Sequence, residues 1–164
     1  MKQTILLICL TISCSFFAQT EGVYFTQADC ESNKIDTSLH CGGWNDTHVS
    51  FKQGDSVVGY AMIDIYGYIN HKGQFFRCGE KQGLLQQYVS GRICIYAAMN
   101  FDFKKDALAL IQSSYICEGR TGELKRVSKK QLEGILKNDQ DLLDKYLIDK
   151  DVIYAITMYN SRHK

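Results

Sequence analysis

Alternating apolar and polar positions dominate the middle of the chain, from residue 49 to about residue 121. The runs VSFKQ, SVVGYAMIDIY, QFFRCG, LLQQYVS, RICIYAAM and SSYICEG are rich in β-branched and aromatic residues, which favour strands. Glycine, asparagine and aspartate must supply the turns, because the chain contains no proline. NHKG (70–73) predicts a hairpin turn, whereas 100–112 fits a strand, a loop or a helical turn.

The apolar spacing changes from that of strands to that of helices in the last quarter of the chain. Ser128 and Gln131 fit a capping box, which predicts a helix over about 129–137. Asn138 and Asp139 can cap a second helix, and 149–160 has the spacing of a third. The inward-facing positions of the three stripes are Leu132, Ile135, Leu136, Leu142, Leu143, Tyr146, Val152, Ile153, Ile156 and Tyr159.

These patterns together predict an α+β fold, in which an antiparallel β-meander forms a small barrel or a sandwich and two or three C-terminal helices follow. A chain of 164 residues with 45% hydrophobic positions can bury a core, which argues against wholesale disorder. Its length suits one domain, placed at 19–164. A formal charge of +1 does not indicate nucleic-acid binding, because it provides no excess of basic residues.

Residues 1–18 have the layout of a secretory signal peptide. Lys2 precedes an apolar run from Ile5 to Ile12, and small or polar residues follow. Cleavage after Ala18 or nearer Ser13 both fit, and a lipidated Cys14 is a further alternative. We therefore expect an exported protein that is periplasmic, surface-associated or secreted. No later segment has the length and apolarity of a membrane-spanning helix.

The remaining cysteines form an odd set, and in an oxidising compartment they favour two disulfides and one free thiol. The disulfide candidates are Cys30, Cys41, Cys78, Cys94 and Cys117. Cys30 and Cys41 are the preferred pair, because they are close in the chain and lie in a polar, irregular stretch. The other three lie in strand-like runs, where cysteine also serves as a small core residue.

The stretch HCGGWNDTH (40–48) is the densest cluster of chemically active residue types. His40, Cys41 and His48 could ligate a metal ion, with Cys30 or His71 as the fourth ligand. However, the closely paired ligands of structural zinc sites are missing. We therefore predict no metal site and no cofactor here.

The same stretch lacks the features of a cysteine hydrolase. Cys41 could pair with His48 or His71, but the sequence predicts no helix N-terminus to stabilise a thiolate at this position. We therefore predict no catalytic residue, and expect a disulfide-pinned surface loop with Trp44 folded onto the sheet. A carboxylate pair drawn from Asp102, Asp106, Glu118 and Glu123 stays open, because its geometry depends on the fold.

Three segments resemble a group of small exported proteins of Gram-negative bacteria: GVY (22–24), YGYINHKGQFFR (66–77) and YICEGRTGELKRVSKKQLEGILKNDQDLLDKY (115–146). The last has that group's strand, Thr-Gly-Glu turn and helix beginning at a serine or threonine. The resemblance implies export, a bacterial source and α+β architecture, and it supplies no catalytic residue. The chain departs from the group in its cysteines and in the insertion around HCGGWNDTH.

The sequence thus predicts a non-enzymatic exported binding domain with a protein partner in the cell envelope and no nucleic-acid partner. The alternative is a secreted hydrolase that uses a Cys/His or carboxylate site. A deep pocket with converging polar groups favours the hydrolase, and a flat aromatic patch favours the binding domain.

Processing of the leader is directly testable. Intact-mass spectrometry of the protein from its native envelope or medium should show loss of the first 13 to 20 residues, because the apolar run and the small residues after it direct cleavage there. A lipid-modified Cys14 at the new N-terminus would indicate lipoprotein processing instead. Exported material that retains Met1 would contradict the prediction.

Overall fold

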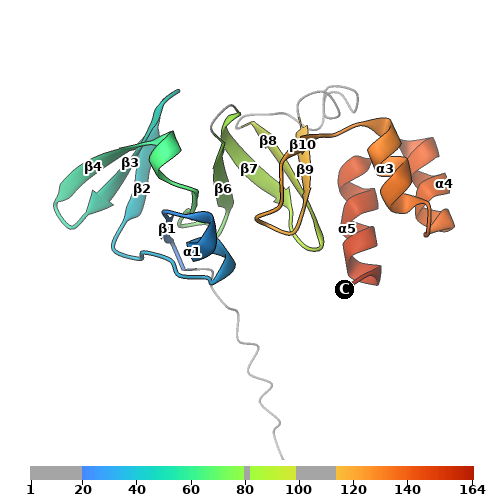
Figure 1. Cartoon of the computed structure of the whole chain (residues 1–164), viewed down its shortest axis with the longest axis horizontal. Coiled ribbons are helices and arrows are strands. Elements are labelled where there is room, and N and C mark those ends of the chain that lie inside the picture. Colours follow the sequence, from blue (N-terminus) through green and yellow to red (C-terminus); the bar gives the residue numbers. More distant parts are fainter. Residues whose placement is uncertain (1–19, 80–81, 99–113) are drawn as a thin grey trace, which may run out of the picture.

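A computed structural model describes residues 20–79, 82–98 and 114–164, which form an elongated molecule (Figure 1). A three-stranded sheet lies at one end, a seven-stranded sheet in the middle and three helices at the other end. The predicted leader (1–18) and the segment 100–112 lie outside the described residues. No helix of the described part has the length and apolarity needed to cross a membrane.

The larger sheet is an antiparallel meander with the strand order β1-β5-β6-β7-β8-β9-β10. Its strands are β1 (Gly22–Tyr24), β5 (Gly67–Ile69), β6 (Phe75–Gly79), β7 (Gly83–Val89), β8 (Ile93–Ala98), β9 (Ser114–Glu118) and β10 (Lys125–Arg126). The predicted α+β class, with a meander followed by helices, is therefore confirmed. The sheet does not close on itself, so the prediction of a small barrel is wrong.

The predicted turn at 70–73 connects β5 to β6. The Asn70 side-chain oxygen accepts hydrogen bonds from the backbone N–H groups of Lys72 and Gln74, each at 3.0 Å. Gly73 has φ = 72°, in the left-handed region that glycine adopts at no steric cost. The asparagine and the glycine together fix the hairpin.

The smaller sheet has the order β2-β3-β4, with β2 (His40–Trp44), β3 (His48–Gln53) and β4 (Ser56–Ala61). Val49 and Phe51 on β3 are fully buried against the larger sheet. A short 3-10 helix (Met62–Asp64) leads from β4 to the larger sheet. A core joins the two sheets and is called the hairpin-side core here, because it lies on the side of the β2–β3 hairpin. It contains Val23, Leu39, Val49, Phe51, Met62, Ile65, Tyr68, Phe76, Cys78 and Leu84.

Alternation along β8 divides the rest of the interior into two layers. Ile93 and Ile95 face the helices, whereas Cys94 and Tyr96 face the opposite side of the sheet. The helix-side core contains Val89, Ile93, Ile95, Ile116, Val127, Leu132, Leu136, Leu142, Tyr146, Val152, Ala155 and Ile156. The opposite layer, called the thiol layer here, contains Tyr24, Cys30, Ile69, Phe75, Leu85, Cys94, Tyr96 and Cys117.

All three predicted C-terminal helices are present: α3 (Lys129–Leu136), α4 (Gln140–Asp149) and α5 (Val152–Arg162). The side chains of Ser128, Asp139 and Asp151 accept hydrogen bonds from the first turns of the three helices, as N-caps do. A further short helix, α1 (Gln27–Glu31), has a full capping box of Thr26 and Asp29. The expectation of an irregular stretch around Cys30 is therefore wrong.

Asn160 fastens α5 to the start of β8. Its side chain accepts from the backbone N–H of Ile93 (2.9 Å) and donates to the carbonyls of Ile93 (2.7 Å) and Ser90 (3.2 Å). A Cβ atom on Gly91, which has φ = 140°, would lie 2.7 Å from the Asn160 side chain. Glycine at position 91 therefore permits this close approach.

Burial of the helical stripes makes a stability prediction. Leu136 and Leu142 are 0% and 2% exposed, so Leu136→Ala or Leu142→Ala should each lower the free energy of unfolding by about 2–5 kcal/mol. The Lys129 side chain is 66% exposed in an i,i+4 ion pair with Glu133, so Lys129→Ala should cost less than about 0.5 kcal/mol. Urea unfolding measures all three, and equal small losses would contradict the packing described.

Candidate functional site

The stretch HCGGWNDTH forms a β-hairpin rather than the expected surface loop. Its turn depends on Asn45, whose side-chain oxygen accepts from the backbone N–H groups of Thr47 (2.9 Å) and His48 (2.8 Å). Trp44 lies at the end of β2 and is 49% exposed. The prediction that Trp44 folds onto the sheet is therefore wrong.

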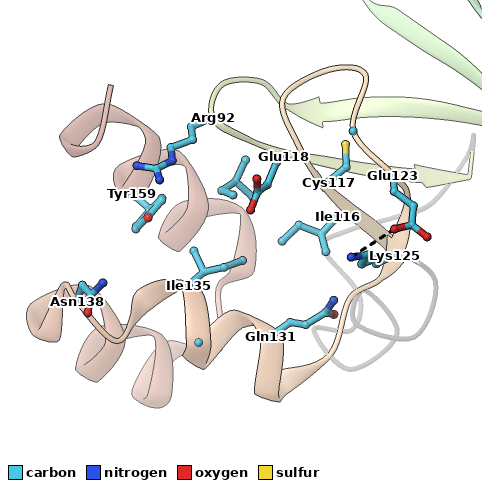
Figure 2. A pocket seen from close by; sticks show the side chains of 13 residues that line it. Arg92, Ile116, Cys117, Glu118, Glu123, Lys125, Gln131, Ile135, Asn138 and Tyr159 are labelled. Carbon is cyan, nitrogen blue, oxygen red and sulfur yellow. Dashed lines mark ion pairs between the residues drawn. The ribbon is translucent and has the colours of Figure 1, made fainter. Parts of the chain in front are cut away.

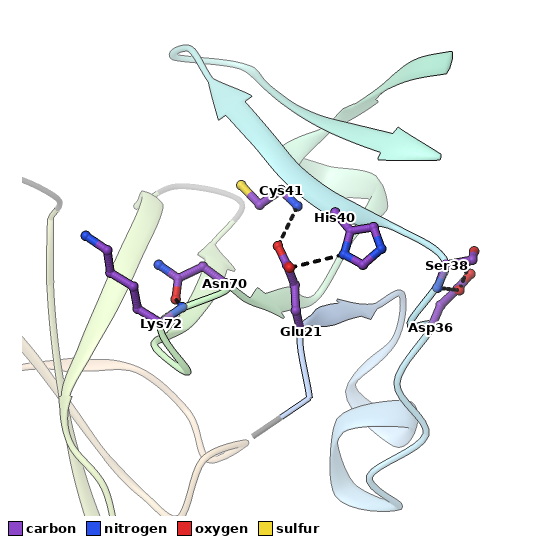
Figure 3. A network of polar contacts seen from close by, with 7 residues as sticks. All are labelled: Glu21, Asp36, Ser38, His40, Cys41, Asn70 and Lys72. Carbon is purple, nitrogen blue, oxygen red and sulfur yellow. Dashed lines mark hydrogen bonds and ion pairs between the residues drawn. The ribbon is translucent and has the colours of Figure 1, made fainter. Parts of the chain in front are cut away.

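Glu21 fastens the first strand of this hairpin (Figure 3). One carboxylate oxygen accepts from the backbone N–H of Cys41 and the other contacts Nδ1 of His40, both at 3.1 Å. Because β2 is an edge strand, the carboxylate satisfies a backbone donor that the sheet leaves unpaired on that side. The contact is a structural anchor.

The candidate ligands of the hairpin do not converge. Cys41 packs against the hairpin-side core, while its neighbour His40 lies on the exposed face, opposite Lys52. His48 contacts the hydroxyl of Thr47 (2.8 Å), and His71 is exposed in the 70–73 turn. Within the residues that the structure describes, no three His, Cys, Asp or Glu side chains gather as metal ligands.

All five candidate cysteines are described as free thiols, and four of them are buried. The preferred pair Cys30–Cys41 is not formed, because Cys30 lies on α1 in the thiol layer and Cys41 packs on the hairpin-side core. Cys41 shares that core with Cys78. Cys94 and Cys117 lie directly opposite each other on β8 and β9. The fold therefore groups the thiols differently from their order in the chain.

Burial raises the pKa of most of these thiols. It raises the pKa of Cys78 to about 12 and also raises the pKa of Cys30 and Cys41. These groups are therefore protonated at neutral pH and are weak nucleophiles. The expectation that cysteines in strand-like runs serve as core residues describes Cys78 well.

Arg77 anchors the turn between β9 and β10 over the thiol layer. Its Nη1 donates to the carbonyl of Gly122 at 2.7 Å and lies 3.5 Å from that of Arg120. The guanidinium also lies over the ring of Tyr66, 5.0 Å from the centroid, where a cation–π contact is favourable. Burial raises the pKa of Tyr66 to about 12, and the Arg77 charge opposes that rise.

On the other face of β9, a groove of about 640 Å³ is lined by residues of the sheet, α3 and α5 (Figure 2). Ile116 and Ile135 lie at its centre, and Ile93 belongs to the same apolar floor. Charged and polar side chains surround this floor: Arg92, Glu118, Glu123, Lys125, Gln131, Asn138 and Tyr159. An apolar floor with a polar rim is typical of ligand-binding sites.

Two of the four candidate carboxylates line this groove. Glu118 and Glu123 both line it, while Asp102 and Asp106 lie outside the described residues. Glu123 is 80% exposed and forms an ion pair with Lys125 at 3.4 Å. Glu118 is also exposed. Neither has the apolar enclosure that keeps a general acid protonated in glycosidases.

Sequence reasoning missed this groove. Glu118 and Glu123 were candidates only as carboxylates, and Gly134 and the isoleucine floor were not identified as a binding site. The signal was present in the repeated Ile-Cys pair of RICIY and YICEG, which sends isoleucine to one face of β8 and β9 and cysteine to the other. The position of α3 above the isoleucines could not be read from that pattern.

No protein-family model, curated protein or solved structure matches this chain. The functional argument therefore rests on the site itself.

Arg77 provides a test of the turn anchor. Arg77→Met should lower the free energy of unfolding by about 1.5–3 kcal/mol, because it removes charged hydrogen bonds to the carbonyls of Gly122 and Arg120. Lys72→Met, in the exposed 70–73 turn, is the control and should change it by less than about 0.5 kcal/mol. Equal effects in urea unfolding would show that the Arg77 contacts contribute no more than a surface charge.

Proposed function

We propose that the chain is an exported, non-enzymatic binding domain, and that its groove between the sheet and the helices holds a short peptide segment of a protein partner in the cell envelope. The leader-like N-terminus supports export. The groove volume of about 640 Å³ lies in the range of natural ligand sites. Ile135, which is partly exposed, suits one apolar side chain of the peptide, and the rim offers charges of both signs to its neighbours.

The observation that carries the proposal is Gly134, which lies within the eight-residue helix α3 and lines the groove. Glycine inside a helix costs about 1 kcal/mol relative to alanine. Neither backbone nor packing requires it, because φ is not left-handed and an added Cβ would meet no heavy atom within 4 Å. Gly134 lies at the exposed rim of the groove, so a large side chain here would narrow the entrance, and a function that needs this space open accounts for the glycine.

The lining residues favour binding over catalysis. Within the part of the chain that the structure describes, they include no serine, threonine or histidine, and the side chain of Cys117 belongs to the thiol layer on the other face. Among the described residues, the groove therefore has no hydroxyl or thiol nucleophile paired with a histidine base. The polar groups lie around an apolar floor rather than converging on one point.

One observation favours the alternative of a secreted hydrolase: Glu118 and Glu123 line the same groove. This alternative has its own test, which is an activity assay. Hydrolysis of aryl glycosides by the purified protein would have to be lost in both Glu118→Gln and Glu123→Gln, because each carboxylate has its own role in glycoside hydrolysis.

Closing the groove tests the proposed function. Gly134→Trp should leave the fold intact, since tryptophan has the better helix propensity, and should abolish binding of capped hexapeptides with a central leucine flanked by lysine and glutamate. In the parent protein, NMR titration with these peptides should shift the amide signals of Ile116 and Ile135. Gly134→Ala should raise the free energy of unfolding by about 1 kcal/mol.

Gly59→Trp on β4 is the matched control, because an added Cβ at Gly59 also meets nothing within 4 Å and the residue lies outside the groove. It should bind like the parent. Peptide binding that survives Gly134→Trp, or shifts confined to other surfaces, would place the binding site elsewhere. Failure of the whole peptide panel to bind would refute the peptide ligand.

A further inference from the structure

We propose that Cys94 and Cys117 form a redox-active pair that converts between two thiols and a cross-strand disulfide by exchange with external disulfides. The proposal concerns the thiol layer and does not depend on what the groove binds. It assigns a covalent modification site to two side chains that the sequence alone left among several pairings.

Strand register supplies the geometry. Cys94 on β8 and Cys117 on β9 are direct partners in an antiparallel pair. Cα atoms of such partners lie about 4.5–5.5 Å apart, within the span of about 4.4–6.8 Å that a disulfide bridges. Both side chains point to the thiol layer, so the two sulfur atoms lie on the same face of the sheet.

Neighbouring groups hold the two sulfur atoms in place. The side-chain amide of Gln87 donates to Sγ of Cys94 at 3.2 Å, and the Cys117 thiol donates to the carbonyl of Gly119 at 3.0 Å. Nη1 of Arg77 lies 4.0 Å from Sγ of Cys117. Cationic groups and hydrogen-bond donors around a sulfur favour the thiolate, the reactive form in exchange.

The two thiols have different chemical roles. Donation from the Cys117 thiol to an ionised Cys94 lowers the pKa of Cys94, with help from the backbone of Gly91, the amide of Gln87 and the charge of Arg120, although burial opposes the shift. The same hydrogen bond and burial raise the pKa of Cys117. Cys94 also lines the surface hollow described next, so we assign it as the attacking thiol and Cys117 as the thiol that closes the disulfide.

A surface hollow of about 420 Å³ provides the route to Cys94. Its lining includes Cys94, Cys30, Ser90 and Arg120. Cys94 itself is only 1% exposed, so an external disulfide must enter this hollow to reach it. Burial raises the pKa of Cys30, which leaves this third thiol protonated and a slower nucleophile than Cys94.

The exchange balances with a low-molecular-weight disulfide, RSSR, as the oxidant. The Cys94 thiolate attacks one sulfur of RSSR, which forms a mixed disulfide and releases RS⁻. Cys117 then loses its proton and attacks Sγ of Cys94, which releases the second RS⁻. Two electrons pass from the cysteine pair to RSSR, and the protons of the two thiols end on two molecules of RSH.

Peptide mapping tests the pairing, with glutathione as the probe. The protein without its leader is equilibrated in buffers of increasing oxidised-to-reduced glutathione ratio, quenched with acid, alkylated and digested with trypsin without reductant. The tryptic peptides 93–104 and 106–120 should appear joined at oxidising ratios and separate again when reduced glutathione is added. Cys30 should be alkylated in the oxidised sample.

Two variants separate the roles of the pair. Cys117→Ser should stop the reaction at a glutathionyl group on Cys94, because the closing thiol is gone. Cys94→Ala should abolish the joined peptides and leave Cys117 without glutathione. Cys78→Ser is the matched control, since Cys78 is also buried in a strand but packs on the hairpin-side core, and it should leave the exchange unchanged.

Three outcomes would overturn the proposal: a disulfide that joins Cys94 to Cys30, alkylation of both Cys94 and Cys117 at every ratio, or reaction only after denaturant is added. If Cys94→Ala does not fold, the peptide map of the parent protein and the trapped adduct in Cys117→Ser still show whether Cys94 and Cys117 form the pair. Circular dichroism of each variant verifies its fold. None of these results depends on peptide binding in the groove, so this proposal and the proposed function can fail separately.

Discussion

The period-two alternation of side chains on β8 and β9 is the constraint on which the rest of the structure depends. A strand buried on both faces must send consecutive residues to different environments. Ile93 and Ile116 therefore face the helices, while Cys94 and Cys117 face the thiol layer. A slip of one residue in register would exchange the two sets and place cysteines under the helices. The groove and the thiol pair are thus two consequences of one strand pairing.

The two faces of the sheet are covered by different means. One face packs against α3, α4 and α5 at its β8–β9 end and against the β2-β3-β4 sheet at its β5–β6 end. Among the described residues, the other face is covered by α1 and the turns around it, and polar anchors such as Arg77 secure that cover. Beside β9 the helices leave a groove, in which Ile93 and Ile116 are covered to 5% exposure and Ile135 is partly exposed.

Local patterns could predict most of the fold. The strands, the 70–73 turn and the helix caps at Ser128 and Asp139 depend on neighbouring residues, so spacing and turn chemistry reveal them. Closure could not be predicted, because the barrel and the open sheet share the same alternation. The HCGGWNDTH hairpin was missed because glycine and asparagine read as loop formers, while its pairing partner VSFKQ was already identified as a strand.

The site was harder to predict because its parts are distant in sequence. The groove joins Arg92, Glu118 and Gly134, which only the packing of α3 onto the sheet brings together. Nearness in the chain favoured a Cys30–Cys41 disulfide, although the two side chains pack in different cores. Cys94 and Cys117 are direct partners because antiparallel register, not sequence distance, sets which residues meet.

The thiol pair and the groove share a strand, which connects their chemistry physically. Cys117 lies between Ile116 and Glu118, both of which line the groove on the opposite face of β9. A covalent bond from Cys117 to Cys94 would fix the register of β8 and β9 beneath the isoleucine floor and restrict their relative motion. A restricted floor loses less conformational freedom when a ligand binds. Oxidation would therefore act on the groove through rigidity rather than through any contact with the ligand.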